Sequence, residues 1–330
     1  MKKEYLRYKF KEFDRVKALV IGDVMIDSYF LGKVHRISPE APVPIISVDK
    51  KEHRLGGAAN VALNLKSLGA TPIVCSVVGN DSNAQLLMQL FEKESIATDN
   101  ILLDESRVTT VKTRMIGNNT QLLRVDEEIT DNINTDIEQK LIETIKNTIE
   151  NSEIKVIIFE DYDKGVITPN LITEIVDFAN KKGIPTTVDP KKNNFLNYKN
   201  VTLFKPNLKE LKEGLKEDDL DIKNIDDYLI KLNDLLPHNI SFVTLSEQGV
   251  FITDFNEKHH IPAHLRNIAD VSGAGDSVIS VASLALAVDM SIKEIAELAN
   301  LAGGLVCEKV GVVPIEKNIL LSEAIEKLAD

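Results

Sequence analysis

Residues 156–188 read VIIFEDYDKGVITPNLITEIVDFANKKGIPTTV and hold a strand, a helix and a second strand in succession. Val156–Phe159 and Thr186–Val188 are short runs rich in β-branched residues, which are typical of buried strands. The apolar residues between them recur on one helical face, as packing on a sheet requires: Leu171, Ile172, Ile175 and Phe178. Strands connected by a helix in this way predict parallel neighbours in one sheet.

The same alternation of strand and helix continues along most of the 330 residues. Further strands are predicted at Ala18–Ile21, Ile73–Val77, Thr202–Phe204 and Phe242–Leu245. Further helices are predicted at Asn60–Leu68, Ala84–Lys93 and Asp136–Ile149. Continuous apolar strands separated by helices favour a mostly parallel sheet that is covered by helices on both faces. We therefore predict an α/β fold.

Two segments interrupt this alternation. Tyr29–Arg54 holds three prolines between strand-like pieces. Val108–Ile116 and Gln121–Val125 flank Gly117-Asn118-Asn119, which is a strong hairpin signal. Because these strands lie outside the strand–helix alternation, we expect them to form a small separate sheet.

We expect this small sheet to be inserted, as about residues 29–55 and 107–127, into a single domain that spans residues 1–330. A sheet over the mouth of a site would act as a lid that excludes water during a reaction. An edge hairpin without such a role is the alternative. The exposed edge of the small sheet also offers a surface on which two copies could form a homodimer.

The composition is typical of a soluble globular protein, with 43% hydrophobic and 27% charged residues and a formal net charge of −12. This charge argues against a general binder of nucleic acid or membrane surfaces, because a polyanion would be repelled. Cys75 and Cys307 are far apart and flanked by apolar residues, so we expect two buried thiols. Residues 1–17 lack the apolar core of a signal peptide, and Val278–Val288 is too short to cross a bilayer. We expect a cytoplasmic protein.

The segment Asp270-Val271-Ser272-Gly273-Ala274-Gly275-Asp276 precedes an apolar helix. Small residues leave the backbone uncovered where that helix begins, and its unpaired N–H groups and positive dipole end form an anion site. An aspartate there is unsuited to bind an anion, but it is suited to take a proton from a hydroxyl that attacks phosphorus. The alternative is a glycine turn with Asp276 as an ordinary first-turn residue.

Two segments near the amino terminus could belong to the same site. Gly22–Asp27 follows the first strand, where an α/β sheet places its ligand crevice, and Asp27 could accept hydrogen bonds from sugar hydroxyls. Gly56–Asn60 opens a helix with small residues that allow a substrate to approach the backbone. A dinucleotide-binding loop is the competing interpretation, but the spacing is not G-x-G-x-x-G and the first strand is well upstream.

In this order, the motifs resemble those of the ribokinase family, also called the phosphofructokinase-B family, over nearly the whole chain. They are Asp27, the Gly56–Asn60 helix start, the N-x-x-E element Asn207–Glu210 and the late Asp270–Asp276 segment. The resemblance implies a ribokinase-like fold and a carbohydrate kinase that uses ATP and Mg²⁺. The chain departs from the family pattern at two positions: Val278 stands where the family often has phenylalanine, and Ser246 where it often has glycine. These departures leave open how the adenine packs and whether the chain is a generic sugar kinase.

Three further segments resemble the kinases of ADP-heptose synthesis, which phosphorylate D-glycero-β-D-manno-heptose 7-phosphate at O1: Arg36–Pro44, Asp161–Gly165 and Val188–Lys191. In many bacteria this kinase is fused to an adenylyltransferase, and because the chain ends at Asp330 we expect a free-standing kinase. A kinase for another sugar or sugar phosphate is the main alternative. A non-catalytic nucleotide or sugar sensor and a dehydrogenase are alternatives from other classes.

The resemblance implies that Asp276 is the catalytic base and that the N–H groups around Gly273, Ala274 and Gly275 stabilise the transferred phosphoryl group. It implies the following ATP-binding residues: Lys191, Asn207, Leu208, Lys209, Glu210, Ser246, Glu247, Gly249 and Asn300. Asn207 and Glu210 would organise Mg²⁺–ATP through water, since Mg²⁺ keeps much of its hydration shell. The sugar-binding positions that it implies are Asp27, Gly56, Gly57 and Asn60.

A phosphorylated sugar needs cations for its phosphate, and basic residues cluster on the lid segments: Arg36, Arg54, Lys112, Arg114 and Arg124. A guanidinium binds phosphate through two parallel hydrogen bonds, so one or two of these residues would anchor the 7-phosphate. The alternative for each is solvated surface charge. We assign to the substrate Arg36, Lys112 and Arg114, together with Lys164, which follows a core strand and is expected to face the cleft.

Overall fold

The computed structural model describes residues 1–217, 219–264 and 266–329. Within them, nine strands form one large sheet in the order β13-β12-β11-β10-β9-β8-β1-β4-β5. Their bounds are β1 Lys17–Gly22, β4 Thr71–Gly79, β5 Ile101–Asp104, β8 Ile154–Glu160, β9 Thr186–Asp189, β10 Val201–Phe204, β11 His238–Thr244, β12 Val250–Thr253 and β13 Lys258–Ile261. Neighbours from β5 to β11 are parallel, whereas β12 and β13 add an antiparallel edge. The predicted mostly parallel α/β fold is confirmed.

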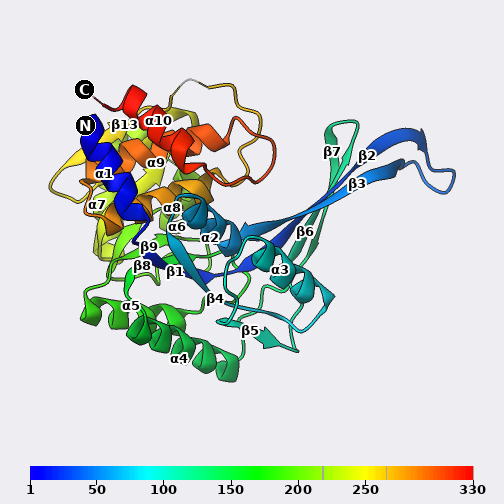
Figure 1. Cartoon of the computed structure of the whole chain (residues 1–330), viewed down its shortest axis with the longest axis horizontal. Coiled ribbons are helices and arrows are strands. Elements are labelled where there is room, and N and C mark those ends of the chain that lie inside the picture. The colour runs from blue at the N-terminus through cyan, green and yellow to red at the C-terminus, as the bar shows by residue number, and fades with distance from the viewer. Residues whose placement is uncertain (218, 265, 330) are drawn as a thin grey trace.

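Helices cover both faces of this sheet (Figure 1). One face carries α1 Lys3–Phe13, α2 Ala58–Ser67, α3 Ser82–Lys93, α8 Ala274–Ala287, α9 Ile292–Val306 and α10 Lys317–Lys327. The other carries α4 Thr135–Asn151, α5 Pro169–Lys182, α6 Leu208–Leu215 and α7 Ile225–Leu235. Successive strand residues point to opposite faces, so Val20 packs with the first group and Leu19 with the second. Among the described residues, every helix is too short or too polar to cross a lipid bilayer.

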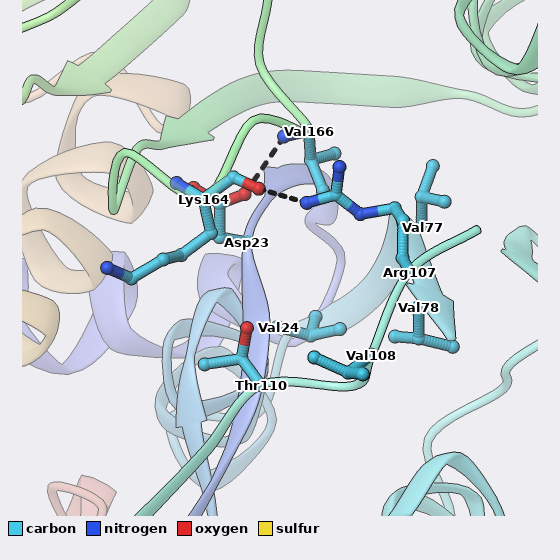
Figure 2. Close-up of a pocket in the computed structure, with 9 residues that line it drawn as sticks. All are labelled: Asp23, Val24, Val77, Val78, Arg107, Val108, Thr110, Lys164 and Val166. Carbon is cyan, nitrogen blue, oxygen red and sulfur yellow. Dashed lines mark hydrogen bonds between the residues drawn. The ribbon is translucent and has the colours of Figure 1, made fainter. Parts of the chain in front are cut away.

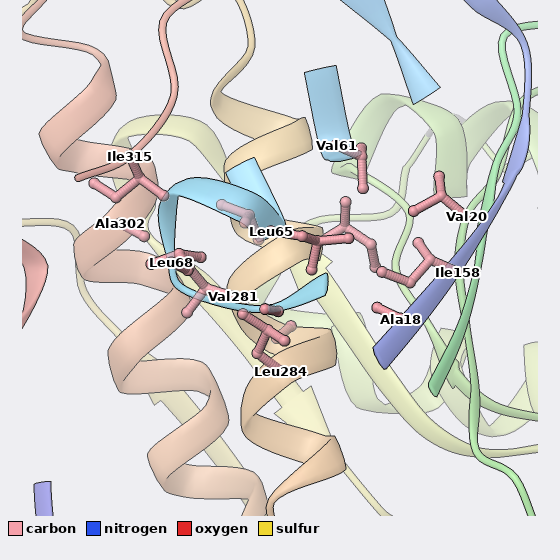
Figure 3. Packing of buried hydrophobic residues seen from close by; sticks show 14 of the residues in the cluster. Ala18, Val20, Val61, Leu65, Leu68, Ile158, Val281, Leu284, Ala302 and Ile315 are labelled. Atoms are coloured by element: carbon pink, nitrogen blue, oxygen red, sulfur yellow. The ribbon is translucent and has the colours of Figure 1, made fainter. Parts of the chain in front are cut away.

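The core on the first face is built around α8, which is buried along most of its length. Figure 3 shows Val61 of α2 on the side of Val20 and Ile158 of the sheet, while Val281 and Leu284 of α8 lie near Leu68 of α2. Helix α9 packs against α8 as well. A helix that is enclosed on all sides must be apolar nearly all round, as the sequence of α8 is. This burial holds the first turn of α8 in a defined place at the edge of the sheet.

The helix predicted in the opening stretch of sequence is α5. Thr168 caps its amino terminus by accepting a hydrogen bond from the Leu171 N–H, and Pro169 occupies the first turn, where its missing N–H costs nothing. Gly183 ends the helix with φ of 69°, in the left-handed region that favours glycine. These local signals set the ends of the loop that connects β8 to α5, residues 161–168.

The remaining strands form a second sheet in the order β3-β2-β6-β7. Their bounds are β2 Val24–Ile37, β3 Pro44–Gly57, β6 Val111–Gly117 and β7 Thr120–Glu127. The pairs β2–β3 and β6–β7 are antiparallel, and β2–β6 is parallel. Asn118 and Asn119 form the turn between β6 and β7 with φ of 51° and 63°, a conformation that asparagine tolerates. The β2–β3 hairpin projects away from the large sheet (Figure 1).

Candidate active site

The carboxyl ends of three parallel strands meet at one edge of the large sheet. Gly22 of β1 is in register with Glu160 of β8, which is in register with Asp189 of β9. Open α/β sheets bind ligands at such carboxyl ends. A side chain at Gly22 would not fit, because its Cβ would lie 2.0 Å from the Glu160 carbonyl oxygen.

The glycine turn before α8 faces the same edge. Gly273 has φ of 76° and precedes the first turn of the helix, and a Cβ on Gly275 would lie 3.5 Å from Asp189 Oδ2. Asp270 holds the turn, since its carboxylate accepts hydrogen bonds from the N–H groups of Ser272 and Gly311 at 3.0 and 2.9 Å. The Ala274 N–H donates to the Val271 carbonyl oxygen at 3.3 Å, and the N–H groups of Gly273 and Gly275 lie at the positive end of the helix dipole.

Asp276 lies in the first turn of α8 and is only 5% exposed. Its Oδ2 accepts a hydrogen bond from Asn60 Nδ2 at 2.5 Å, and its Oδ1 accepts one from the Tyr162 hydroxyl at 2.8 Å. Burial raises the pKa of Asp276, while the two hydrogen bonds act in the opposite direction. The result is a buried, oriented carboxylate at a helix start.

Asn60 is fully buried on α2, and its amide is aimed at Asp276. The sequence placed Asn60 among sugar-binding residues, and in the structure its closest polar partner is the predicted base. Gly57, directly before α2, has φ of 58°, and Gly56 packs so closely on Asp27 that a Cβ would lie 2.4 Å from the carboxylate. The two glycines therefore permit a close approach of backbone and side chains at this point.

Tyr162 belongs to the Asp161–Gly165 segment, and the sequence predicts no role for it. Its hydroxyl bonds to Asp276, and its ring is approached by two ammonium groups, Lys112 Nζ at 5.6 Å and Lys191 Nζ at 5.4 Å from the centroid. Both distances suit cation–π contact. A tyrosine after a strand gives no local signal that its hydroxyl will meet an aspartate 114 positions later.

A buried carboxyl at Asp23 organises the loop that carries Tyr162. It accepts hydrogen bonds from the N–H groups of Tyr162, Lys164 and Val166 at 2.8, 3.1 and 3.1 Å. Figure 2 shows Asp23 beside Val166, with Arg107 donating to the Lys164 carbonyl oxygen at a small cavity. The loop is thus held by its backbone, which fixes the position from which Tyr162 reaches Asp276.

Lys191 lies at the centre of a second cluster on the nucleotide side predicted from the sequence. Its Nζ is 2.7 Å from Glu210 and 3.4 Å from Asp189, and Asp189 also pairs with the buried Lys205 at 2.8 Å. Asn207 and Glu210 form a capping box at the start of α6. Of the other two residues predicted there, Leu208 begins α6, whereas Lys209 is 83% exposed and pairs with Glu213 of the same helix.

The turn Ser246–Gly249 follows β11, the strand next to the segment that holds Asn207. Ser246–Gln248 form a short 3-10 helix that includes Glu247, and Gly249 has φ of 89°. Asn300 is buried on α9, where its Nδ2 donates to the Pro262 carbonyl oxygen at 2.9 Å. In the described residues Asn300 therefore ties a loop to α9.

Most of the predicted lid cations already have a carboxylate partner. Arg114 pairs with Asp27 at 2.6 Å, and both side chains are largely buried. The remaining pairs are Lys164 with Glu128, Arg124 with Asp126 and Arg54 with Glu52. Arg36 is exposed in the projecting part of the β2–β3 hairpin, and the structure does not bring it to the other candidates (Figure 1). Lys112 has no carboxylate within ion-pair distance in the described part of the chain.

Glu160 is a further residue that the sequence left without a role. It is fully buried, and neither carboxylate oxygen has a hydrogen-bond partner among the described residues. Burial, with Asp189 and Asp276 nearby, raises the pKa of Glu160 well above its usual range. Neither here nor elsewhere in the described residues could a group of three or more His, Cys, Asp or Glu side chains hold a metal ion.

Solved structures share this fold. Phosphofructokinase-2 from Escherichia coli in complex with potassium aligns with a TM-score of 0.79 and 18% identity, covering 95% of this chain and 98% of that one. Arabidopsis thaliana ribokinase complexed with ribose and ATP aligns with a TM-score of 0.72 and 16% identity, covering 93% and 98%. At these identities the likeness establishes the ribokinase-like fold.

Sequence comparison adds the family. Bifunctional protein HldE of Geobacter sulfurreducens is 38% identical over 315 residues, which cover 94% of this chain and 63% of that protein. Bifunctional protein HldE of Aliarcobacter butzleri is 41% identical over 293 residues, which cover 89% and 61%. The chain thus spans less than two thirds of these relatives. The model of the pfkB family carbohydrate kinases matches residues 16–318, and the chain therefore belongs to this family of sugar kinases.

Proposed function

We propose that the protein transfers the γ-phosphoryl group of ATP to the O1 hydroxyl of D-glycero-β-D-manno-heptose 7-phosphate. The observation that carries the proposed chemistry is the buried carboxylate of Asp276 at the start of α8, held by Asn60 and Tyr162. Membership of a carbohydrate kinase family supports a sugar hydroxyl as the acceptor. The choice of the heptose phosphate rests on the resemblance of three segments: Arg36–Pro44, Asp161–Gly165 and Val188–Lys191.

In the proposed reaction, Asp276 takes the proton of the O1 hydroxyl as that oxygen attacks the γ-phosphorus. The new O–P bond forms while the bond to the bridging oxygen of ADP breaks, which yields the 1,7-bisphosphate and ADP. The N–H groups of residues 273–275 stabilise the negative charge on the transferred group. A general base contributes about 10²–10⁴ in rate, and burial makes Asp276 a stronger base than an exposed aspartate.

Mg²⁺ with ATP would be held through water by Asn207 and Glu210. Amide and carboxylate oxygens are the donors that this ion prefers. Both Glu210 carboxylate oxygens already accept hydrogen bonds, one from Lys191 and one from the Asn207 N–H, which favours contact through water. The ion supplies charge neutralisation on the phosphates when it is bound, and Lys191 would add a positive charge on the same side.

For the 7-phosphate we propose Lys112 as the principal anchor, with Lys164 beside it. Arg114, one of the anchors expected from the sequence, is instead engaged with Asp27. Lys164 is close enough to Lys112 to lower the pKa of Lys112, and of the pair only Lys164 has a carboxylate partner among the described residues. The Tyr162 side chain extends between Asp276 and Lys112, so a bound sugar could present its hydroxyl at one end and its phosphate at the other.

The second sheet, β3-β2-β6-β7, would act as a lid over the sugar, since Lys112 and Arg114 both belong to β6. We also propose that two copies pair through this sheet. Several apolar side chains on it or in its β2–β3 turn are exposed: Ile37, Val43, Val48, Leu122, Leu123 and Val125. Light scattering coupled to size-exclusion chromatography would test the dimer, and a monomer at micromolar concentration would contradict it.

Coupled ADP release with heptose 7-phosphate, fructose 6-phosphate and ribose tests the proposed substrate. We expect the highest kcat/KM with heptose 7-phosphate. A higher kcat/KM with fructose 6-phosphate or ribose would identify that sugar as the acceptor instead. Asp276→Asn should lower kcat by about 10²–10⁴ while ATP still binds. Asp289→Asn, an exposed aspartate beyond the other end of α8, is the matched control. Undiminished turnover of Asp276→Asn would refute the assigned base.

A further inference from the structure

The Tyr162 side chain makes contacts on three sides. Its hydroxyl donates to Asp276 Oδ1 at 2.8 Å, and its ring lies 5.6 Å from Lys112 Nζ and 5.4 Å from Lys191 Nζ. Lys112 is on β6 of the second sheet, whereas Lys191 is paired with Glu210 and Asp189 on the predicted nucleotide side. One residue of the β8–α5 loop thus touches the proposed base, the proposed lid and the proposed nucleotide site.

We propose that Tyr162 is a positioning residue for phosphoryl transfer, which orients the Asp276 carboxylate and keeps it ionised at neutral pH. This inference rests on the proposed role of Asp276 as the base. With Asn60 on Oδ2 and Tyr162 on Oδ1, both oxygens are held, so the plane of the carboxylate is defined. A carboxylate has about four acceptor sites, and two donors leave room for the sugar hydroxyl.

The charges around Asp276 explain why a donor is needed. Asp189 brings negative charge to the same edge of the sheet, and Lys191 brings positive charge. Burial and the Asp189 carboxylate disfavour the ionised form of Asp276, whereas the Tyr162 hydrogen bond favours it. Without the hydroxyl, the pKa of Asp276 should rise, and a larger share of the enzyme would carry a protonated, inactive base.

Tyr162 is suited to donate and not to accept a proton. Burial, with the carboxylates of Asp276 and Glu160 nearby, raises the pKa of Tyr162 well above its usual value, so the phenol stays protonated. The backbone of the residue is held as well, because its N–H donates to the buried Asp23 at 2.8 Å. An anchored backbone and a protonated hydroxyl are what a positioning residue requires.

Tyr162→Phe tests the inference, because it removes the hydroxyl and keeps the ring that Lys112 and Lys191 approach. A hydrogen bond to a charged group is worth roughly one to two pKa units. The acid limb of the kcat–pH profile should therefore move about one unit to higher pH, with a small change in the KM for the sugar. The substrate phosphate also titrates, but it does so equally with the wild type and with Tyr162→Phe, so it does not contribute to the difference between their kcat–pH profiles.

Tyr198→Phe is the matched control. Tyr198 is fully buried, and its hydroxyl also donates to a carboxylate at 2.8 Å, but that carboxylate is Asp161. Both variants lose one such hydrogen bond, so both should be less stable to heat, and only Tyr162→Phe should shift the acid limb. An equal shift in both variants, or none in Tyr162→Phe, would overturn the inference.

A second substitution covers the case in which Tyr162→Phe fails to fold. Site-specific 3-fluorotyrosine at position 162 has nearly the same shape and a more acidic phenol, so it donates a stronger hydrogen bond. The acid limb should then move to lower pH, and an unmoved limb would again overturn the inference. If Asp276→Asn retains wild-type turnover, the proposed base itself is wrong. If Asp276→Asn is inactive and neither Tyr162 variant shifts the limb, the inference alone fails.

Discussion

Replacing Lys112 by methionine removes one positive charge from β6 and keeps a side chain of similar length. Lys112 differs from Arg114 and Lys164 in having no carboxylate within ion-pair distance among the described residues. If its ammonium binds the substrate phosphate, the variant loses one charge-assisted hydrogen bond, worth about 1.5–3 kcal/mol. That free energy corresponds to an increase of about 10- to 150-fold in the KM for the phosphorylated sugar.

The same substitution should leave the fold intact. Burial and the neighbouring charge of Lys164 lower the pKa of Lys112, so folding disfavours its charged form. The charge therefore lowers the free energy of unfolding at pH values below the ordinary pKa of a lysine, including pH 7. We expect the Tm of Lys112→Met at pH 7 to equal or exceed that of the wild type.

The assay is ADP release with heptose 7-phosphate and, separately, with the unphosphorylated heptose. Only the phosphorylated sugar should lose affinity, and the KM for ATP should stay the same. Lys51→Met is the matched control, because Lys51 belongs to the same sheet and also lies over an aromatic ring, Phe30, at 4.6 Å. An unchanged KM, or an equal increase for both sugars, would refute Lys112 as the phosphate anchor.

Three further substitutions test other contacts. Arg114→Met leaves the Asp27 carboxylate buried without its partner and should lower the free energy of unfolding by about 2–3 kcal/mol; adding Asp27→Asn should recover most of that loss in urea denaturation. Gly165→Ala should lower the free energy of unfolding by about 2 kcal/mol or more in the same assay, because φ is 80° and the new Cβ would lie 2.0 Å from the Asp131 carbonyl oxygen. A smaller decrease would mean that the loop can shift. Lys191→Met should raise the KM for ATP by about tenfold and leave the KM for the sugar nearly unchanged, and the opposite pattern would move Lys191 to the sugar side.

The strand–helix alternation was readable from sequence because its signals are local. The strands predicted at Ala18–Ile21 and Val156–Phe159 lie within β1 and β8, and the helix predicted from the apolar face of Leu171 to Phe178 is α5. The antiparallel edge formed by β12 and β13 was not predicted. Both strands are as short as β9 and β10, but no α-helix separates them from β11 or from each other, so they lie outside the strand–helix alternation from which the other strands were predicted.

The candidate site was predicted in part. Asp276 and its glycine turn carry a recognisable local pattern, and the structure places the aspartate in the first turn of α8. Tyr162 and Glu160 were not assigned a role, because nothing in their neighbours indicates that one meets Asp276 and the other is buried without a partner. Arg114 was expected to face a phosphate, and only the register of β2 with β6 shows that Asp27 reaches it.

The sequence by itself therefore determined the order of strands and helices, the glycine turn before α8 and the acidic overall charge. The first two features depend on residues within a few positions of one another, and the overall charge is the sum of the charges of the side chains. The tertiary structure decided which distant side chains meet: Asn60 and Tyr162 reach Asp276 from 216 and 114 positions away. A hydrogen bond needs two atoms within about 3 Å of each other, and that precision comes from strand register and helix packing, which no local pattern encodes.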